Sequence, residues 1–140
     1  MPEEVTSINS AYNLLAEGLL TNQGKTKIGS FWEFIRDIWA QGFEHPEYFQ
    51  AWHVGKLCEE VEQCITDNMN YLAILPRAHF KSTILGHAFS IWRSLKIQGN
   101  ANILYLSYSD TMAKYHISEL NKEVNRNPVL KELMTNRAPQ

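Results

Sequence analysis

The sequence predicts an α/β fold built around a parallel sheet, and its second half carries the features that lead to this prediction. Residues 71–75 and 103–106 are apolar runs of the length that buried strands have. Each run is followed by a segment whose apolar residues recur at helical spacing. Continuous apolar strands that alternate with helices are typical of parallel sheets with right-handed crossovers. We therefore expect the order strand, loop, helix, strand, helix from residue 71 onward.

The rest of the chain is expected to be helical, with boundaries set by capping residues. Ser30 is a favourable N-cap for an aromatic-rich helix, and Gly42 offers a stop for it. Either Asp110 or Ser109 is expected to cap the helix after the second strand. The expected helices cover residues 6–20, 31–41, 46–67, 82–95, 111–124 and 129–134.

Length and composition fit one soluble domain. The chain has 140 residues, 44% hydrophobic and 20% charged, which allows one domain with a core and hardly two. No apolar run approaches the roughly 18 to 20 residues that span a bilayer. The N-terminus is acidic, whereas a secretory signal begins with basic residues. These features indicate a soluble intracellular protein.

The two cysteines and the charge distribution say less about function. Cys58 and Cys64 lie six residues apart in an expected helix, so their thiols point in different directions. Both are expected to be small buried residues.

The two halves of the sequence differ in charge. Residues 1–70 carry 11 acidic and 4 basic side chains, whereas residues 71–140 carry 4 acidic and 9 basic ones. A basic second half suits an anionic ligand. A chance asymmetry between two surfaces is an equally good explanation.

The segment between the first expected strand and the next helix has the chemistry of a phosphate-binding loop. It reads Pro-Arg-Ala-His-Phe-Lys-Ser-Thr over residues 76–83. Backbone N–H groups at a helix start have no partner within the helix, and they point toward an anion placed there. A lysine at this point reaches the β- and γ-phosphates, and the hydroxyl after it holds Mg²⁺. Lys81 and Ser82 occupy these two positions.

The loop departs from the usual pattern of Gly, four residues and Gly-Lys-Ser/Thr. Leu75 stands at the first glycine position and Phe80 at the second. A bulky side chain at the second position obstructs the close approach of backbone to phosphate, so the Phe80 ring is expected to turn into the core. If the ring does not turn, the affinity for nucleotide is expected to be low.

Three segments together resemble the large terminase subunits of tailed bacteriophages. The loop at residues 76–83 is similar to their degenerate Walker A motif, in which an arginine precedes the lysine by four residues. The segment Phe-Gln-Ala-Trp-His at residues 49–53 is similar to the one that precedes Walker A in these proteins. The segment Ile-Leu-Tyr-Leu-Ser-Tyr-Ser-Asp at residues 103–110 is similar to their second strand. The likeness covers residues 45–135.

The resemblance implies a phosphate-loop NTPase-like parallel sheet, incomplete and preceded by a helical N-terminal segment. Residues 1–45 would be that segment, and residues 46–140 the first part of the ATPase domain, ending before Walker B. The implied activity is an ATPase that uses ATP and Mg²⁺ to move double-stranded DNA into a procapsid, in a parent protein that is also an endonuclease. The implied partners are the portal protein, the small terminase subunit and further copies in a ring. The implied setting is the cytoplasm of an infected host cell, without a membrane.

Candidate site residues follow from the motif and from the resemblance. Lys81 and Arg77 are the catalytic candidates, since the guanidinium either contacts the γ-phosphate or orients a carboxylate; a surface salt bridge is the alternative for Arg77. Ser82 is the metal candidate. The loop backbone and the Thr83 hydroxyl are expected to hold phosphates. Three residues of the segment at 49–53 are expected either to frame the adenine or to lie in the core. These residues are Ala78, His79, Phe80 and Thr83 for the phosphates, and Gln50, Trp52 and His53 for the adenine. For His79, a contact with the loop backbone is an equally good expectation.

Other functions remain open at this point. A helicase or a nucleotide kinase would share the loop, and the sequence after Gln140 would separate them from a terminase. A non-catalytic protein that binds partner proteins is favoured by the missing glycines and by the missing Walker B motif. Asp110 follows two polar residues and is expected to be a helix cap rather than a metal ligand.

Overall fold

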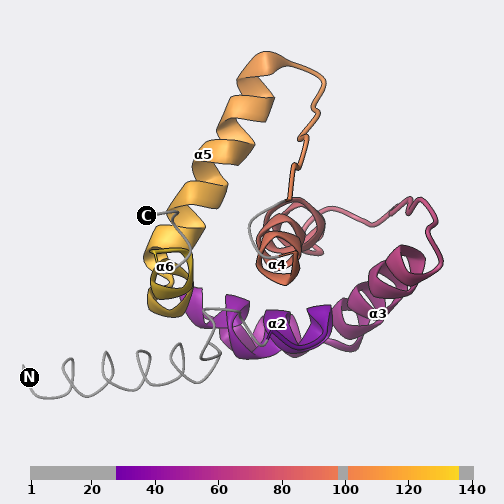
Figure 1. Cartoon of the computed structure of the whole chain (residues 1–140), viewed down its shortest axis with the longest axis horizontal. Helices are drawn as coiled ribbons and strands as arrows, with labels where there is room; N and C mark the ends of the chain where they lie inside the picture. The colour runs from indigo at the N-terminus through magenta and orange to yellow at the C-terminus, as the bar shows by residue number, and fades with distance from the viewer. Residues whose placement is uncertain (1–27, 98–100, 136–140) are drawn as a thin grey trace, which may run out of the picture.

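The computed structural model describes residues 28–97 and 101–135, and these form a helical assembly (Figure 1). Helix α5 rises from the base of the assembly, and α6 folds back at its foot, while α2 and α3 run along the base beneath α4. The expected helix at residues 6–20 lies outside the described residues. The elements are α2 (Phe31–Asp37), η1 (Trp39–Gly42), η2 (Pro46–Gln50), α3 (Trp52–Thr66), η3 (Ser82–Ala88), α4 (Phe89–Lys96), α5 (Asp110–Arg126) and α6 (Pro128–Thr135).

Helix α2 begins where the capping residues predict. The Ser30 side chain accepts a hydrogen bond from the Glu33 amide at 3.2 Å, and the Glu33 carboxylate accepts one from the Ser30 amide at 2.9 Å. This reciprocal capping satisfies two N–H groups that the helix cannot satisfy itself. Glu62 on α3 accepts a third, from the Phe31 amide at 2.9 Å, so the start of α2 is also fastened to α3.

The later helices follow the expected order with shifted ends. The expected helix at residues 46–67 is divided into η2 and α3, because the backbone at Ala51 is extended. Ser109, and not Asp110, caps α5, through a hydrogen bond from the Met112 amide at 3.2 Å. Helix η3 has π-helical geometry and runs directly into α4, whose apolar residues face the core. Single turns of π-helix are rare and occur often at functional sites.

Aromatic side chains dominate the core. The Phe31 ring lies 5.1 Å from that of Trp92 and 5.6 Å from that of Phe89, which joins α2 to α4. A second series of ring contacts starts at Phe34 and continues with centroid separations of 6.3, 6.0, 4.8 and 4.7 Å. Its members, in order of contact, are Phe34, Trp39, Phe43, Phe49 and Phe80. The second series therefore leads from α2 to the loop that precedes η3.

The expected parallel sheet is wrong for the described part of the chain, because residues 28–97 and 101–135 contain no strand. Both expected strands are unpaired connections between helices (Figure 1). Leu72 and Ile74 are 83% and 86% exposed, whereas their neighbours in sequence pack against the core. An apolar run of five residues suits any extended segment with one face buried, and a strand also needs a hydrogen-bonded neighbour. The predicted phosphate-loop NTPase-like sheet is therefore not present here.

Asn127 joins two distant parts of the helical assembly. Its amide nitrogen donates a hydrogen bond to the Ile38 carbonyl at 2.7 Å, and its side-chain oxygen accepts from the amides of Val129 and Leu130. The side chain is 1% exposed. It therefore caps α6 and satisfies a carbonyl at the end of α2 at the same time.

Replacement of Asn127 by alanine is expected to lower the free energy of unfolding by about 1–3 kcal/mol, since the cap of α6 is lost and the Ile38 carbonyl keeps only the hydrogen bond from the Gln41 amide at 3.3 Å. Asn125→Ala is the matched control, because that exposed side chain only donates to the Asn121 carbonyl of its own helix. Urea unfolding followed by circular dichroism measures both variants. Equal losses in the two variants would contradict the role of Asn127.

Cys58 is expected to be inert toward thiol reagents in the folded protein. The side chain is buried, and burial together with the nearby carboxylates of Glu62 and Glu59 raises its pKa to about 12. In Cys64→Ala, whose single remaining thiol is Cys58, alkylation at pH 8 is expected to be about 10³-fold slower than in urea. Mass spectrometry of the labelled chain gives both rates. Similar rates in the folded and unfolded protein would contradict the burial.

Candidate phosphate-binding site

The loop between Pro76 and Lys81 adopts the backbone geometry that glycines usually supply. Ala78 has φ of 61° and Phe80 has φ of 56°, both in the left-handed region. A residue other than glycine costs about 1 kcal/mol or more in this region, so the surrounding structure holds the loop in place. Left-handed residues in a turn can bring backbone N–H groups toward one side, as in concave anion-binding loops.

The Phe80 side chain packs toward the core. Its ring lies 4.7 Å from the Phe49 ring, and the residue is half-buried among partly buried residues that surround the core. Atoms of Phe80 also line one wall of the hollow above the loop. The ring therefore holds the loop against η2 and does not fill the hollow.

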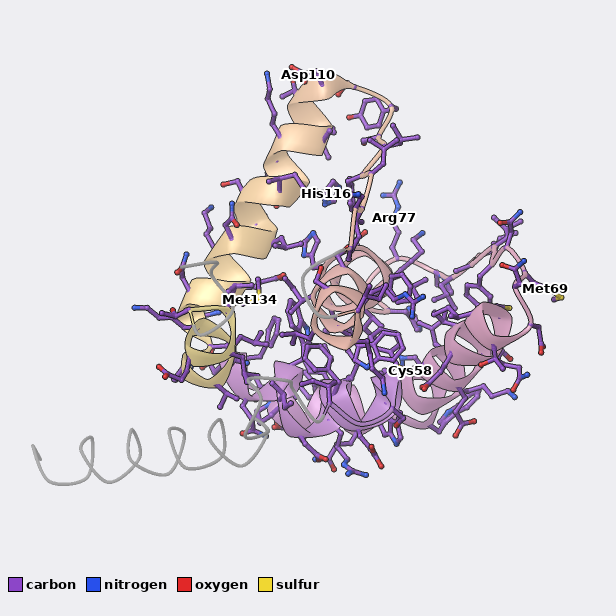
Figure 2. All side chains as sticks on the ribbon, in the orientation of Figure 1. Cys58, Met69, Arg77, Asp110, His116 and Met134 are labelled. Atoms are coloured by element: carbon purple, nitrogen blue, oxygen red, sulfur yellow. The ribbon has the colours of Figure 1, made fainter. Side chains whose placement is uncertain are left out.

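A hollow of about 670 Å³ lies over the loop and the first residues of η3. It is lined by Tyr48 and by residues 76–83. Arg77, Lys81 and Ser82 are exposed there, and none of the lining residues is acidic. Figure 2 shows the Arg77 side chain directed away from the helices. Two cationic side chains beside an open hollow without carboxylates favour an anionic ligand.

The helix start forms the floor of this hollow. Lys81 has helical backbone angles, with φ of −50° and ψ of −54°, and Ser82 begins η3. The Ile84 amide donates to the Phe80 carbonyl at 2.8 Å, so the first hydrogen bond of the helix closes over Lys81, Ser82 and Thr83. The amides of a helix's first turn lack partners within the helix, so they are available to an anion above them.

His79 stabilises the loop through a hydrogen bond to its backbone. Its Nδ1 lies 2.8 Å from the Arg77 carbonyl oxygen, and because a carbonyl only accepts, this nitrogen carries the proton. The His79 ring also meets the His53 ring edge-on at 5.5 Å. The Nε2 atom of His53 is buried and has no hydrogen-bond partner among the described residues. His53 therefore supports the loop through His79 and not through direct contact with the hollow.

The residues predicted to frame the adenine do not line the hollow. Trp52 is 83% exposed, and Gln50 is also exposed. Tyr48 lines the hollow instead, and its ring stacks on that of His45 at 5.0 Å and 26°. Sequence reasoning passed over Tyr48, whose only local signal is an exposed aromatic ring shortly before the expected binding segment. Its place beside the loop depends on how η2 packs.

The metal-binding potential of the site is limited. The described residues contain no group of three or more His, Cys, Asp or Glu side chains arranged to hold a metal. Ser82 offers one hydroxyl oxygen at the hollow. Mg²⁺ commonly keeps several waters and takes its other ligands from substrate phosphates. Ser82 thus fits a metal that arrives with a polyphosphate and does not fit a resident metal centre.

Comparison with protein-family models, with curated proteins and with solved structures gives no match to this chain. Among residues 28–97 and 101–135, no helix has the length and apolar character needed to cross a bilayer.

Phe80→Gly is expected to leave the protein more stable than Phe80→Ala by about 1 kcal/mol. Both variants lose the contact with Phe49, but only glycine adopts a positive φ without strain. Thermal unfolding of the two variants side by side measures the difference. In an ordinary helix or strand position alanine would be the more stable of the two, so that order would contradict the left-handed conformation of residue 80.

Proposed function

We propose that residues 76–83 bind the phosphates of a nucleoside triphosphate, and that the chain is the ATP-binding part of a viral DNA-packaging motor. The observation that carries the proposal is the loop backbone at Ala78 and Phe80. Both residues hold left-handed conformations around an open hollow at the start of a helix, although neither is glycine. Maintaining this strained geometry in a loop is typical of functional sites. The motif likeness to terminases selects ATP and DNA packaging among the possible nucleotide-dependent functions.

The side chains at the hollow have distinct proposed roles. Lys81 places its ammonium group against the β- and γ-phosphates, and the amides that follow it contact the same oxygens. Arg77 offers paired donors to the terminal phosphate, which a lysine in its place would not reproduce. Ser82 supplies one oxygen to Mg²⁺ that is bound with the triphosphate, and Thr83 lies next to it near the α-phosphate.

The described residues alone support ATP binding better than ATP hydrolysis. No acidic residue lines the hollow, so no carboxylate there positions water or completes the shell of the metal. In the proposed motor these groups belong to other parts of the protein and to a neighbouring subunit in the ring, which supplies an arginine. Such an arginine is worth about 10³ to 10⁵ in rate. We therefore expect measurable binding and very slow hydrolysis from this chain alone.

A second candidate function is a non-catalytic module that binds other proteins. It is favoured by the exposed apolar side chains on the two unpaired connections between helices. Five of them are between 79% and 87% exposed, namely Leu72, Ile74, Leu104, Leu106 and Tyr108. Exposed apolar patches of this kind mark interaction sites in soluble proteins. The absence of nucleotide binding would select this candidate.

Lys81→Ala is expected to weaken ATP binding by about tenfold to 150-fold, the loss that follows when one charge-assisted hydrogen bond is removed. Isothermal titration calorimetry with ATP and Mg²⁺ measures this, with Lys114→Ala as the matched control. Lys114 is also exposed, but it lies on α5 and pairs with Asp110 at 2.6 Å, away from the hollow. The control is expected to bind like the parent protein.

Inorganic sulfate and ADP serve as further ligands in the same titration. Tighter binding of ATP than of ADP, lost in Lys81→Ala, supports contact with the terminal phosphate. Equal affinity of the parent protein and Lys81→Ala for ATP would overturn the assignment of this loop.

A further inference from the structure

A second polar cluster lies away from the loop, between η3 and α5. His87 on η3 is 5% exposed, and its Nδ1 lies 2.7 Å from a carboxylate oxygen of Glu123 on α5. On the other side of the ring, Nε2 lies 3.3 Å from Nδ1 of His116, also on α5. Figure 2 shows His116 on the side of α5 that faces the preceding connection. The three side chains thus form a continuous chain of hydrogen bonds that joins the two helices.

The hydrogen-bonded cluster of His87, His116 and Glu123 accommodates only a limited number of protons. Glu123 accepts from Nδ1 of His87, so that nitrogen carries hydrogen. Between the two rings one nitrogen donates and the other accepts, which is possible while at least one imidazole is neutral. When both rings are imidazolium ions, both facing nitrogens carry hydrogen. The hydrogen bond is then lost and two positive charges lie side by side.

Neighbouring charged and titratable groups supply little to offset a second positive charge. Glu119 faces His87 from α5, but its carboxylate already accepts a hydrogen bond from Lys122 at 2.7 Å and also feels Arg126. Two phenol side chains also lie near His116. Tyr105, from the connection before α5, places its ring 5.3 Å from His116, and Tyr115 lies 5.5 Å away on α5 itself. Among the described residues, Glu123 is therefore the carboxylate in direct contact with His87. Its single negative charge balances one imidazolium ion.

This contact is the buried polar link between α5 and η3. None of its residues from Asp110 to Arg126 is fully buried. Gly86 leaves the space that Tyr105 occupies, since a Cβ atom at that residue would lie 3.0 Å from the Tyr105 hydroxyl. The buried polar chain is thus one of several attachments of α5, beside the apolar packing of Leu120 and Val124 against the core.

We propose that His87, His116 and Glu123 form a pH-sensitive latch, which holds α5 against η3 near neutral pH and releases it when both histidines are protonated. Histidine side chains change charge in the range between pH 5 and 8. Release frees α5 and the connection before it, while the aromatic core of α2 and α4 stays in place. The latch does not depend on the proposed nucleotide binding, since its residues lie outside the hollow.

Amide hydrogen exchange at pH 7 and pH 5 tests the latch in the whole chain. After correction for intrinsic exchange rates, amides in the middle of α5 are expected to lose at least tenfold of their protection at pH 5, and those of α2 to keep theirs. His116→Asn is the informative variant, because its amide replaces Nδ1 as a hydrogen-bonding group and does not titrate. In this variant the protection of α5 is expected to be the same at both pH values.

His45→Asn is the matched control, since this exposed histidine contacts Glu47 and is expected to leave the pH response of α5 unchanged. If His116→Asn does not fold, nitrogen NMR shifts of the two imidazoles in the parent protein replace it. Loss of α5 protection is then expected to follow the second of the two protonations. Unchanged protection of α5 when both rings are protonated, or an equal loss in a folded His116→Asn protein, would overturn the proposal.

Discussion

The contact between Phe49 and Phe80 is the constraint on which the candidate site depends. It ends a series of aromatic contacts that begins in α2, so the position of the loop is coupled to the best-packed part of the core. A left-handed backbone at Phe80 is unfavourable by itself. Burial of part of the ring against Phe49 counters that cost, because removal of apolar surface from water is favourable by about 25 cal/mol per Å². An aromatic residue thereby takes the place where glycine would adopt this conformation freely.

Polar side chains determine how the helices meet around this core. Glu62 accepts a hydrogen bond from the Phe31 amide, and Asn127 joins the end of α2 to the start of α6. Trp92 and Lys96 donate to the carbonyls of Gly29 and Ile28, which fastens the end of α4 beside the start of α2. In each case a backbone group near a helix end forms a hydrogen bond with a side chain of a distant segment. These contacts fix the helices in one arrangement, which apolar packing alone specifies less strictly.

The phosphate-binding loop and the histidine cluster lie at opposite ends of η3. The loop and Ser82 face the hollow at the start of η3, whereas His87 reaches α5 from the same helix. Helix η3 has π-helical geometry over Ser82–Ala88, so both groups belong to one widened helical segment. A phosphate ligand at one end and a protonation event at the other would therefore act on the same short element.

The helices and their caps were largely determined by local sequence. Ser30 and Ser109 cap helix starts through contacts within a few residues, and the starts of α2, α5 and α6 lie as expected or within one residue. The position of Lys81 and Ser82 at a helix start is likewise a local property. The division into residues 1–45 and 46–140 stays a prediction. ATP binding, DNA packaging and the relation to terminases also stay predictions.

Tertiary structure alone decided the rest. Residues 71–75 and 103–106 have the composition of strands, but a strand exists only when another segment pairs with it, and no such segment is present among the described residues. Tyr48 reaches the hollow, and Gln50 and Trp52 do not, because η2 and α3 meet at an extended residue, Ala51. The contact of His87 with Glu123 spans 36 residues. Contacts over such distances depend on how helices pack, which local spacing along the chain does not encode.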